Sequence, residues 1–312
     1  MMSAPRAMGG TRPEMNPSTQ PAVGQTCLLC GGVQHRPVFT EFGIDILRCH
    51  QCRHVFSSGA GEPHYENFWG DQVDDSDHLY WKKARARMFE DFFSRFIAGR
   101  SGRLLDMGSG LGFFLALMCR YSNWESYGSE ISPAAVRYAR EKLGLANVEC
   151  TRLEDSKWPQ GSFDIVTIWD VLDHVLYPDP FLGRCHSLLK EGGLCFIRVP
   201  NIAMHLPRAR MKKLLWGMRP NMMYLQARDH PHHYSASAVR RVLERNGFVE
   251  IQFLHLRPVD SMAHPGNPLG GGLRYLWFQA VRALATLSGG RLNYDNLFVV
   301  ARKGSLGDSP NR

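Results

Sequence analysis

The sequence predicts an α/β fold in which helices cover a mostly parallel sheet, preceded by a small metal-binding module. Two closely spaced pairs of cysteines lie within residues 27–52. From residue 103 onward, short apolar segments alternate with segments of helical periodicity, which is typical of strand and helix units in a parallel sheet. The chain has 312 residues and 44% hydrophobic composition, so it is long enough for two domains with a sizeable core.

The charge and the apolar runs exclude several function classes. The formal net charge is +8, but the basic residues form only short clusters, which permits an anionic acceptor without requiring nucleic acid. No apolar run approaches the roughly 20 residues that cross a bilayer. Residues 1–25 lack the apolar segment of a secretion signal. We expect them to form a disordered leader, and we expect the protein to be cytoplasmic.

The cysteine pairs predict a zinc ribbon over residues 26–58. They follow the pattern C-x2-C-x18-C-x2-C, which lets two tight turns present four thiolates to one Zn²⁺. Residues 38–39 and 44–48 have the character of short strands joined through Gly43. Nothing marks the chain as secreted, so a metal site is favoured over a pair of disulfides. The expected ligands are Cys27, Cys30, Cys49 and Cys52.

The remaining cysteines and the neighbouring histidines receive no ligand role. Four sulfurs complete a structural site, so we expect His50 and His54 to be surface residues. The other cysteines stand singly in apolar or amphipathic segments, and we expect them to pack in the core. They are Cys119, Cys150, Cys185 and Cys195.

A glycine-rich turn follows a short buried strand at residues 103–107 and precedes an apolar helix that extends to residue 118. Glycine lets the backbone pass close to a ligand, so the turn is expected to be a cofactor loop. Its spacing is G-x-G-x-G, whereas dinucleotide-binding dehydrogenases have G-x-G-x-x-G. Asp106 precedes the turn, which disfavours an anionic pyrophosphate and favours a cationic ligand. The loop glycines are Gly108, Gly110 and Gly112.

Residues 104–112 resemble the first motif of the class I S-adenosylmethionine-dependent methyltransferases, hh-D-x-G-x-G-x-G. Later segments follow the order of this family as well. A second strand ends in Glu130, and the central strand at residues 163–169 is followed by D-V-L-D-H-V, close to the family's D-V-h-E-H-V. The resemblance implies a Rossmann-like seven-stranded sheet within a domain spanning residues 59–302.

The same resemblance assigns the S-adenosylmethionine contacts. It implies that Glu130 binds the ribose hydroxyls and that residues 153–155 line the adenine, although the two acids there are also typical of a solvated loop. The expected cofactor-binding residues are Asp106, Gly108, Gly110, Gly112, Glu130, Leu153, Glu154 and Asp170.

Capping and periodicity place the remaining elements. Ser132 is expected to cap a helix, and residues 191–193 to end the helix that precedes a strand at 194–200. Residues 202–235 interrupt the alternation and form either a lid over the acceptor site or a surface hairpin that covers the core. Two final strands, at 248–256 and 296–301, form the antiparallel pair of the class I sheet.

Two further segments complete the chain. An apolar stripe at residues 273–287 is expected to pack against the sheet, with a membrane surface or a second subunit as alternatives. Residues 303–312 are expected to form a polar tail. The sequence predicts no particular oligomeric state.

The four-cysteine ribbon, the class I core and the segment H-x-x-H-Y-S at residues 230–235 together resemble zinc-ribbon methyltransferases. This group includes sugar-nucleotide C-methyltransferases and other small-molecule enzymes. The resemblance implies methyl transfer to carbon or oxygen of a small-molecule acceptor, such as a nucleotide sugar or a natural-product intermediate. An RNA methyltransferase, favoured by a pI near 9.2, and a non-catalytic zinc-ribbon binding protein are the alternatives.

His230 is the candidate general base or acceptor-orienting group. In the resembled enzymes this segment folds over the cofactor's methyl group, and an imidazole titrates near neutrality. His232 and His233 are equally basic by sequence. The second candidates, of which the first two often serve packing in this family, are Asp173, His174 and Tyr234.

Overall fold

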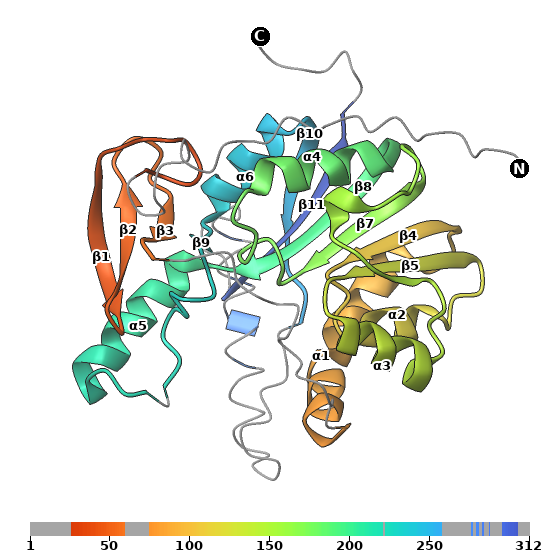
Figure 1. Ribbon diagram of the computed structural model, residues 1–312, viewed down its shortest axis with the longest axis horizontal. Coiled ribbons are helices and arrows are strands. Elements are labelled where there is room, and N and C mark those ends of the chain that lie inside the picture. The colour runs from red at the N-terminus through yellow and green to blue at the C-terminus, as the bar shows by residue number, and fades with distance from the viewer. Residues whose placement is uncertain are drawn as a thin grey trace, which may run out of the picture.

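The computed structural model describes residues 26–59, 75–220, 222–257 and 295–304, with isolated positions between 276 and 287. The expected leader at 1–25, most of the apolar segment at 273–287 and most of the tail lie outside the described residues. Figure 1 shows a large sheet between helices, with a smaller sheet beside it. No helix in the described part of the chain is long and apolar enough to cross a membrane.

The large sheet has seven strands in the order β10-β11-β8-β7-β4-β5-β6. Five of them are parallel, and β11 joins β8 and β10 in antiparallel pairs. This order confirms the predicted α/β class with a Rossmann-like seven-stranded sheet. The strands are β4 (Gly102–Met107), β5 (Trp124–Glu130), β6 (Val148–Cys150), β7 (Phe163–Trp169), β8 (Leu189–Pro200), β10 (Phe248–Leu254) and β11 (Asn296–Lys303).

Helices cover both faces of this sheet (Figure 1). Successive strand residues point to opposite faces, so Leu104 packs with the first three helices while Leu105 packs with α4 and α6. The hydroxyl of Ser132 caps α3 as predicted. The helices are α1 (Asp75–Phe96), α2 (Phe113–Met118), α3 (Pro133–Leu143), α4 (Pro178–Leu188), α5 (Ile202–Trp216) and α6 (Ala236–Arg245).

The junction of α4 and β8 differs from the prediction. The helix ends at Leu188, and residues 191–193, expected to end it, lie inside β8. The pairing of β7 with β8 shifts from Phe163 opposite Leu189 to Ile165 opposite Leu194. The glycines therefore form a bulge that absorbs extra strand residues, because a bulge lets a strand gain residues without losing its partner.

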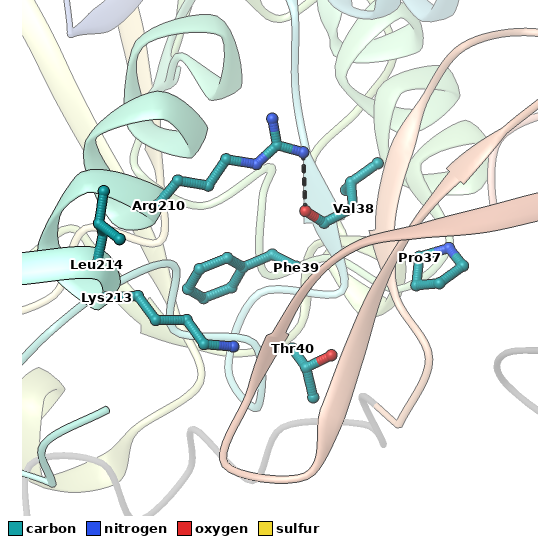
Figure 2. A pocket seen from close by; sticks show the side chains of 7 residues that line it. All are labelled: Pro37, Val38, Phe39, Thr40, Arg210, Lys213 and Leu214. Atoms are coloured by element: carbon teal, nitrogen blue, oxygen red, sulfur yellow. Dashed lines mark hydrogen bonds between the residues drawn. The ribbon is translucent and has the colours of Figure 1, made fainter. Parts of the chain in front are cut away.

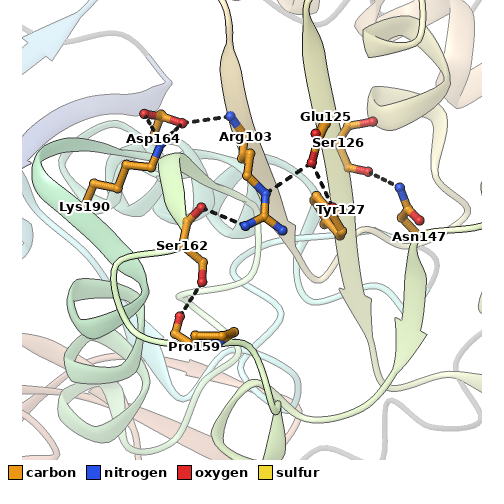
Figure 3. A network of polar contacts seen from close by, with 9 residues as sticks. All are labelled: Arg103, Glu125, Ser126, Tyr127, Asn147, Pro159, Ser162, Asp164 and Lys190. Carbon is orange, nitrogen blue, oxygen red and sulfur yellow. Dashed lines mark hydrogen bonds and ion pairs between the residues drawn. The ribbon is translucent and has the colours of Figure 1, made fainter.

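A polar network joins the amino-terminal ends of the parallel strands (Figure 3). Asp164 accepts a hydrogen bond from the backbone N–H of Arg103 at 2.8 Å and pairs with Lys190 at 2.8 Å. The guanidinium of Arg103 reaches Glu125 at 3.3 Å and lies over the ring of Tyr127. Ligand sites in open α/β sheets lie at the opposite, carboxyl edge, so this network serves the stability of the sheet.

The small sheet has the order β1-β2-β3-β9. Its first three strands are β1 (His35–Glu41), β2 (Ile44–Cys49) and β3 (Val55–Ser57), with the predicted turn at Gly43. The fourth strand, β9 (His232–His233), comes from the segment expected to be a lid or a hairpin. That segment also contains α5, so it is not a simple hairpin, and it joins the ribbon to the large domain.

Two expectations about side chains near and beyond the ribbon are wrong. His54, expected at the surface, is 1% exposed, because β9 covers it. Cys119 and Cys150, expected in the core, are exposed, because Cys119 caps the end of α2 and Cys150 ends the edge strand β6.

We predict that Gly112→Ala destabilises the protein more than Gly144→Ala. Both glycines have a left-handed backbone, with φ of 83° and 70°, so either alanine is strained by about 1 kcal/mol. Only at Gly112 would a Cβ meet neighbours, at 2.6 Å from Leu145 and 3.1 Å from Ala139. Overpacking in Gly112→Ala should lower the free energy of unfolding by a further amount of about 1–3 kcal/mol, which denaturant unfolding measures. Equal losses in the two variants would show that the loop is not packed as described.

Candidate active site

The glycine loop connects β4 to α2 at the carboxyl edge of the sheet. Its three glycines all have positive φ, at 66°, 53° and 83°. A Cβ on Gly108 would lie 2.5 Å from Val171, so the loop closely contacts the segment that follows β7. Beside it, the hydroxyl of Ser109 is buried without a hydrogen-bond partner among the described residues. A tight loop with an unused polar group fits a ligand contact.

Glu130 lies at the end of β5, where the sequence predicts the ribose contact. Its two carboxylate oxygens accept backbone N–H bonds from Gly110 at 2.8 Å and Ser132 at 2.9 Å. Burial raises the pKa of this carboxyl group. Glu130 therefore links the glycine loop to the start of α3 and holds both in position around the cofactor site.

Asp106 lies beneath the loop and is 2% exposed. Burial raises its pKa to about 8, and the nearby charge of Glu130 adds to the rise, while a 2.7 Å bond from the hydroxyl of Thr167 opposes it. Two carboxyl groups with raised pKa values favour a cationic ligand, because a positive charge restores the ionised form of both. A sulfonium and an ammonium group, as in S-adenosylmethionine, meet this requirement.

Asp170, predicted to bind the cofactor, is engaged by arginines. Its carboxylate forms an ion pair with Arg198 and another with Arg85 at 3.0 Å. Its φ of 54° places it in a conformation that non-glycine residues rarely adopt. Strained residues gather at functional sites, and the contact of Asp170 with the cofactor stays a prediction.

Sequence reasoning did not find the two arginines. Arg198 interrupts the otherwise apolar run at residues 194–200 of β8, which was an available signal, whereas Arg85 was indistinguishable from its basic neighbours on α1. Of the predicted adenine contacts, Leu153 is buried in a 3-10 turn next to the site. The side chain of Glu154 lies outside the described residues.

The four ribbon cysteines converge on one point. Their sulfur atoms all lie within 4.8 Å of one another. Cys27 and Cys52 are 3.5 Å apart, and Cys30 and Cys49 are 3.6 Å apart. Tetrahedral zinc with bonds of about 2.3 Å requires sulfurs about 3.8 Å apart, so the donor set fits this ion. Burial raises the pKa of Cys52 to about 11, so a thiolate there needs a cation.

A cluster of histidines and one aspartate lies between the ribbon and the carboxyl edge of β7. Nε2 of His230 is 3.5 Å from Oδ2 of Asp173. The ring of His174 contacts that of His230, with centroids 4.5 Å apart, and its Nδ1 donates to the carbonyl of Asp229. The three residues predicted from the sequence thus lie together in space, although His230 is far along the chain from the adjacent pair Asp173 and His174.

This cluster borders a small cavity of about 50 Å³. His205, which sequence reasoning missed, also lines it. Oδ1 of Asp173 is buried without a hydrogen-bond partner among the described residues. The volume holds a few water molecules, whereas typical ligand sites have 300–1,000 Å³. The cavity can therefore receive only the reacting group of an acceptor.

The ribbon holds the backbone of the His230 segment. Ser57, the last residue of β3, donates its hydroxyl proton to the carbonyl of His230 at 2.9 Å and accepts a bond from Nε2 of His233 at 3.0 Å. His232 donates from Nε2 to the carbonyl of Leu176, so its Nδ1 accepts from Nε2 of His54 at 2.9 Å. Two ribbon residues therefore fix three positions of the segment, at residues 230, 232 and 233.

A second contact holds the start of the same segment. Glu41, at the end of β1, is 5% exposed. Its carboxylate accepts backbone N–H bonds from Leu225 and, at 2.9 Å, from Ala227. A buried carboxylate bound to backbone donors is a strong local anchor.

Tyr234, a second catalytic candidate, is fully buried and stacks on His232. Burial raises the pKa of its hydroxyl group well above the usual value. The structure gives it a packing role at the junction of ribbon and domain, so we do not include it among the residues that contact the acceptor.

The fold and this site define a class I S-adenosylmethionine-dependent methyltransferase. The profile of the family described as "Methyltransferase domain" matches residues 80–252, which is more than half of the chain. The chain belongs to this family, and the prediction made from residues 104–112 is confirmed.

Curated proteins that are similar in sequence to this chain are named as O-methyltransferases. A ubiquinone biosynthesis O-methyltransferase of Nitrosococcus oceani is 27% identical over 59% of this chain and 78% of its own length. Another from Bradyrhizobium sp. (strain ORS 278) is 32% identical over 39% of this chain. The match spans about half, 49%, of the length of that relative.

Solved structures share the fold at low identity. Phosphoethanolamine N-methyltransferase 2 of Haemonchus contortus, in complex with S-adenosyl-L-methionine, has a TM-score of 0.51 and 17% identity over 80% of this chain and 62% of its own. A Thermotoga maritima methyltransferase, described as a possible histamine N-methyltransferase, has a TM-score of 0.50 and 16% identity over 77% of this chain and all of its own. These similarities show the fold alone.

We predict that Glu130→Ala weakens S-adenosylhomocysteine binding at least tenfold, equivalent to about 1.4 kcal/mol, because it removes both a ribose acceptor and the anchor of the loop. Calorimetry measures the affinity. The control is Glu125→Ala on the same strand, whose side chain is 66% exposed, and it should bind normally. Unchanged affinity in a folded Glu130→Ala variant would contradict the ribose assignment.

We also predict one zinc ion per chain, lost in Cys49→Ser and retained in Cys119→Ser. The first change removes one of four converging sulfurs, whereas the second alters an exposed cysteine outside the cluster. Elemental analysis of purified protein measures the zinc content. A zinc-free wild-type protein of full stability would overturn the metal assignment.

Proposed function

We propose that this methyltransferase transfers the methyl group of S-adenosylmethionine to an oxygen or carbon atom of a small-molecule acceptor, with His230 as general base and zinc as a structural ion. The buried pair of His230 and Asp173 carries the proposal. It lies just beyond β7, at the sheet edge that also holds the glycine loop. Sites of open α/β sheets lie at this edge.

The bound cofactor supplies an electrophilic methyl group, and the chain's own residues do the rest. Gly108, Gly110 and Gly112 hold its methionine end, and Glu130 holds the ribose. Displacement at a sulfonium mainly needs the acceptor to be positioned, together with a base where the acceptor must lose a proton.

His230 is suited to take that proton. Burial lowers its pKa to about 3, against a hydrogen bond to the backbone of Leu225 that raises it, so the ring is neutral at pH 7. The imidazolium that forms on proton uptake is buried, and it needs a nearby anion to offset the cost of burying its charge. Burial raises the pKa of the Asp173 carboxyl group, which lies 3.5 Å from Nε2, so a proton taken up by the ring would favour the ionised form of Asp173 and be stabilised by it in turn.

The acceptor class rests on two observations. The cavity beside His230 admits only a reacting group, which suits a hydroxyl or an activated carbon on a small molecule. Similarity to relatives named ubiquinone biosynthesis O-methyltransferases favours oxygen as the methylated atom.

We predict that His230→Gln and His230→Ala lower the rate of methyl transfer at least a hundredfold without changing cofactor affinity, because the base is lost while the glycine loop remains. The acceptor comes first, from a screen with labelled cofactor over nucleotide sugars, phenols and RNA. Single-turnover assays then measure the rate, with His50→Gln, an exposed ribbon histidine, as control. Turnover near the wild-type rate in both His230 variants would exclude the base assignment.

A further inference from the structure

We infer that the outer face of α5 docks on a membrane surface that contains anionic phospholipid. The face carries an apolar stripe. Met211, Leu214 and Leu215 are 54%, 85% and 60% exposed. At 3.6 residues per turn they project within an arc of about 100°. Figure 1 shows this end of α5 at the periphery, extending away from the large sheet.

Cations flank the stripe on both sides. Arg210 precedes it and Lys212 follows it around the helix, each within about 60° of the nearest apolar side chain. This arrangement is typical of helices that lie in the plane of a membrane interface, because the apolar stripe enters the acyl region while the long cationic side chains reach the headgroups.

The positive charge is not balanced locally. Residues 202–228 contain six Lys and Arg residues and no Asp or Glu, and one of the six, Arg208, pairs with Asp295 at 2.6 Å. In the part of the chain that the structure describes, Arg210 and Lys212 donate to the carbonyls of Val38 and Met223, and no carboxylate lies within ion-pair distance of them or of Lys213. These uncompensated positive charges would attract an anionic partner.

The cationic surface continues into the ribbon through a groove. Figure 2 shows Arg210 and Lys213 of α5 on either side of Phe39 of β1, with Leu214 beside them. The open groove has a volume of about 620 Å³, enough for a lipid headgroup. Its lining is cationic, since Arg210 and Lys213 contribute to it and no carboxylate is among the described residues that line it.

A pair of like charges on the ribbon points to the same partner. Arg36 and Arg48 face each other directly across β1 and β2, an arrangement that destabilises a sheet unless an anion lies nearby. Burial lowers the pKa of Arg48, and the neighbouring charges of Arg53, Arg36 and Arg210 lower it further. The cations of the ribbon and of α5 therefore lie close enough together to form one region of positive potential.

Neither of the other occupants fits all of these features. A second copy of the chain would bring the same cations together, which opposes association. Nucleic acid would satisfy the cations, but its phosphates would leave Met211, Leu214 and Leu215 without apolar contacts. A bilayer with anionic lipid offers both kinds of contact.

The test is vesicle flotation of the full-length protein at low ionic strength, with phosphatidylcholine alone and with one quarter phosphatidylglycerol. We expect at least tenfold stronger partitioning onto the anionic vesicles, weakened by salt and unaffected by free phosphate at constant ionic strength. Equal partitioning onto both vesicle types, or none, would overturn the inference.

Variants separate the contributions. Leu214→Ser with Leu215→Ser, and separately Arg210→Gln with Lys213→Gln, should each weaken binding at least tenfold. The control removes two exposed cations from α3, Arg137→Gln with Lys142→Gln, and should change binding less than threefold. All variants should retain wild-type affinity for S-adenosylhomocysteine. Binding of polyuridylate that is lost with the cations but kept in the leucine variant would identify RNA instead and overturn the inference.

Discussion

The pairing of the ribbon with the segment around β9 is the interaction on which the candidate active site depends. The pairing itself is only two residues long, Val55 with His233 and Phe56 with His232. Ser57 extends it to the carbonyl of His230, and Glu41 fixes the backbone at Leu225 and Ala227 from the other end of the ribbon sheet. The large domain contributes contacts of its own, because the carbonyl of Asp173 accepts from the backbone N–H of His232 and Nδ1 of His174 donates to the carbonyl of Asp229, so the segment is held from both sides.

This dependence gives the distant metal site a role in the chemistry. A module of some 30 residues buries too little surface to fold alone, so metal ligation by the four cysteines supplies much of its folding free energy. The sulfurs never approach the acceptor, yet they stabilise the sheet that holds β9. Under the proposed function, zinc would act on methyl transfer through the backbone position of His230. The buried histidines between them, His54 and His232, transmit position and not charge, because burial keeps their pKa values well below neutrality.

Sequence reasoning found what is local and missed what is distant along the chain. The glycine loop, the acid at Glu130 and the cysteine pairs are short patterns whose chemistry is set by spacing, so they were predictable. The contact of His54 with His232 joins residues 178 positions apart, and nothing in either local sequence encodes it. Arg85 likewise pairs with Asp170, a residue from a distant part of the chain. The bulge at residues 191–193 was missed because glycines that can end a helix can equally interrupt a strand.

The central claim is that the ribbon holds the His230 segment in place, and hydrogen exchange before and after zinc chelation tests it most directly. The account predicts that removing zinc exposes the amides of β1 to β3 and also those of residues 224–234, while β10 and β11 keep their protection. Cofactor affinity should be nearly unchanged, because the glycine loop is held by Glu130. Loss of protection confined to the ribbon, with residues 224–234 as slow to exchange as before, would contradict the account.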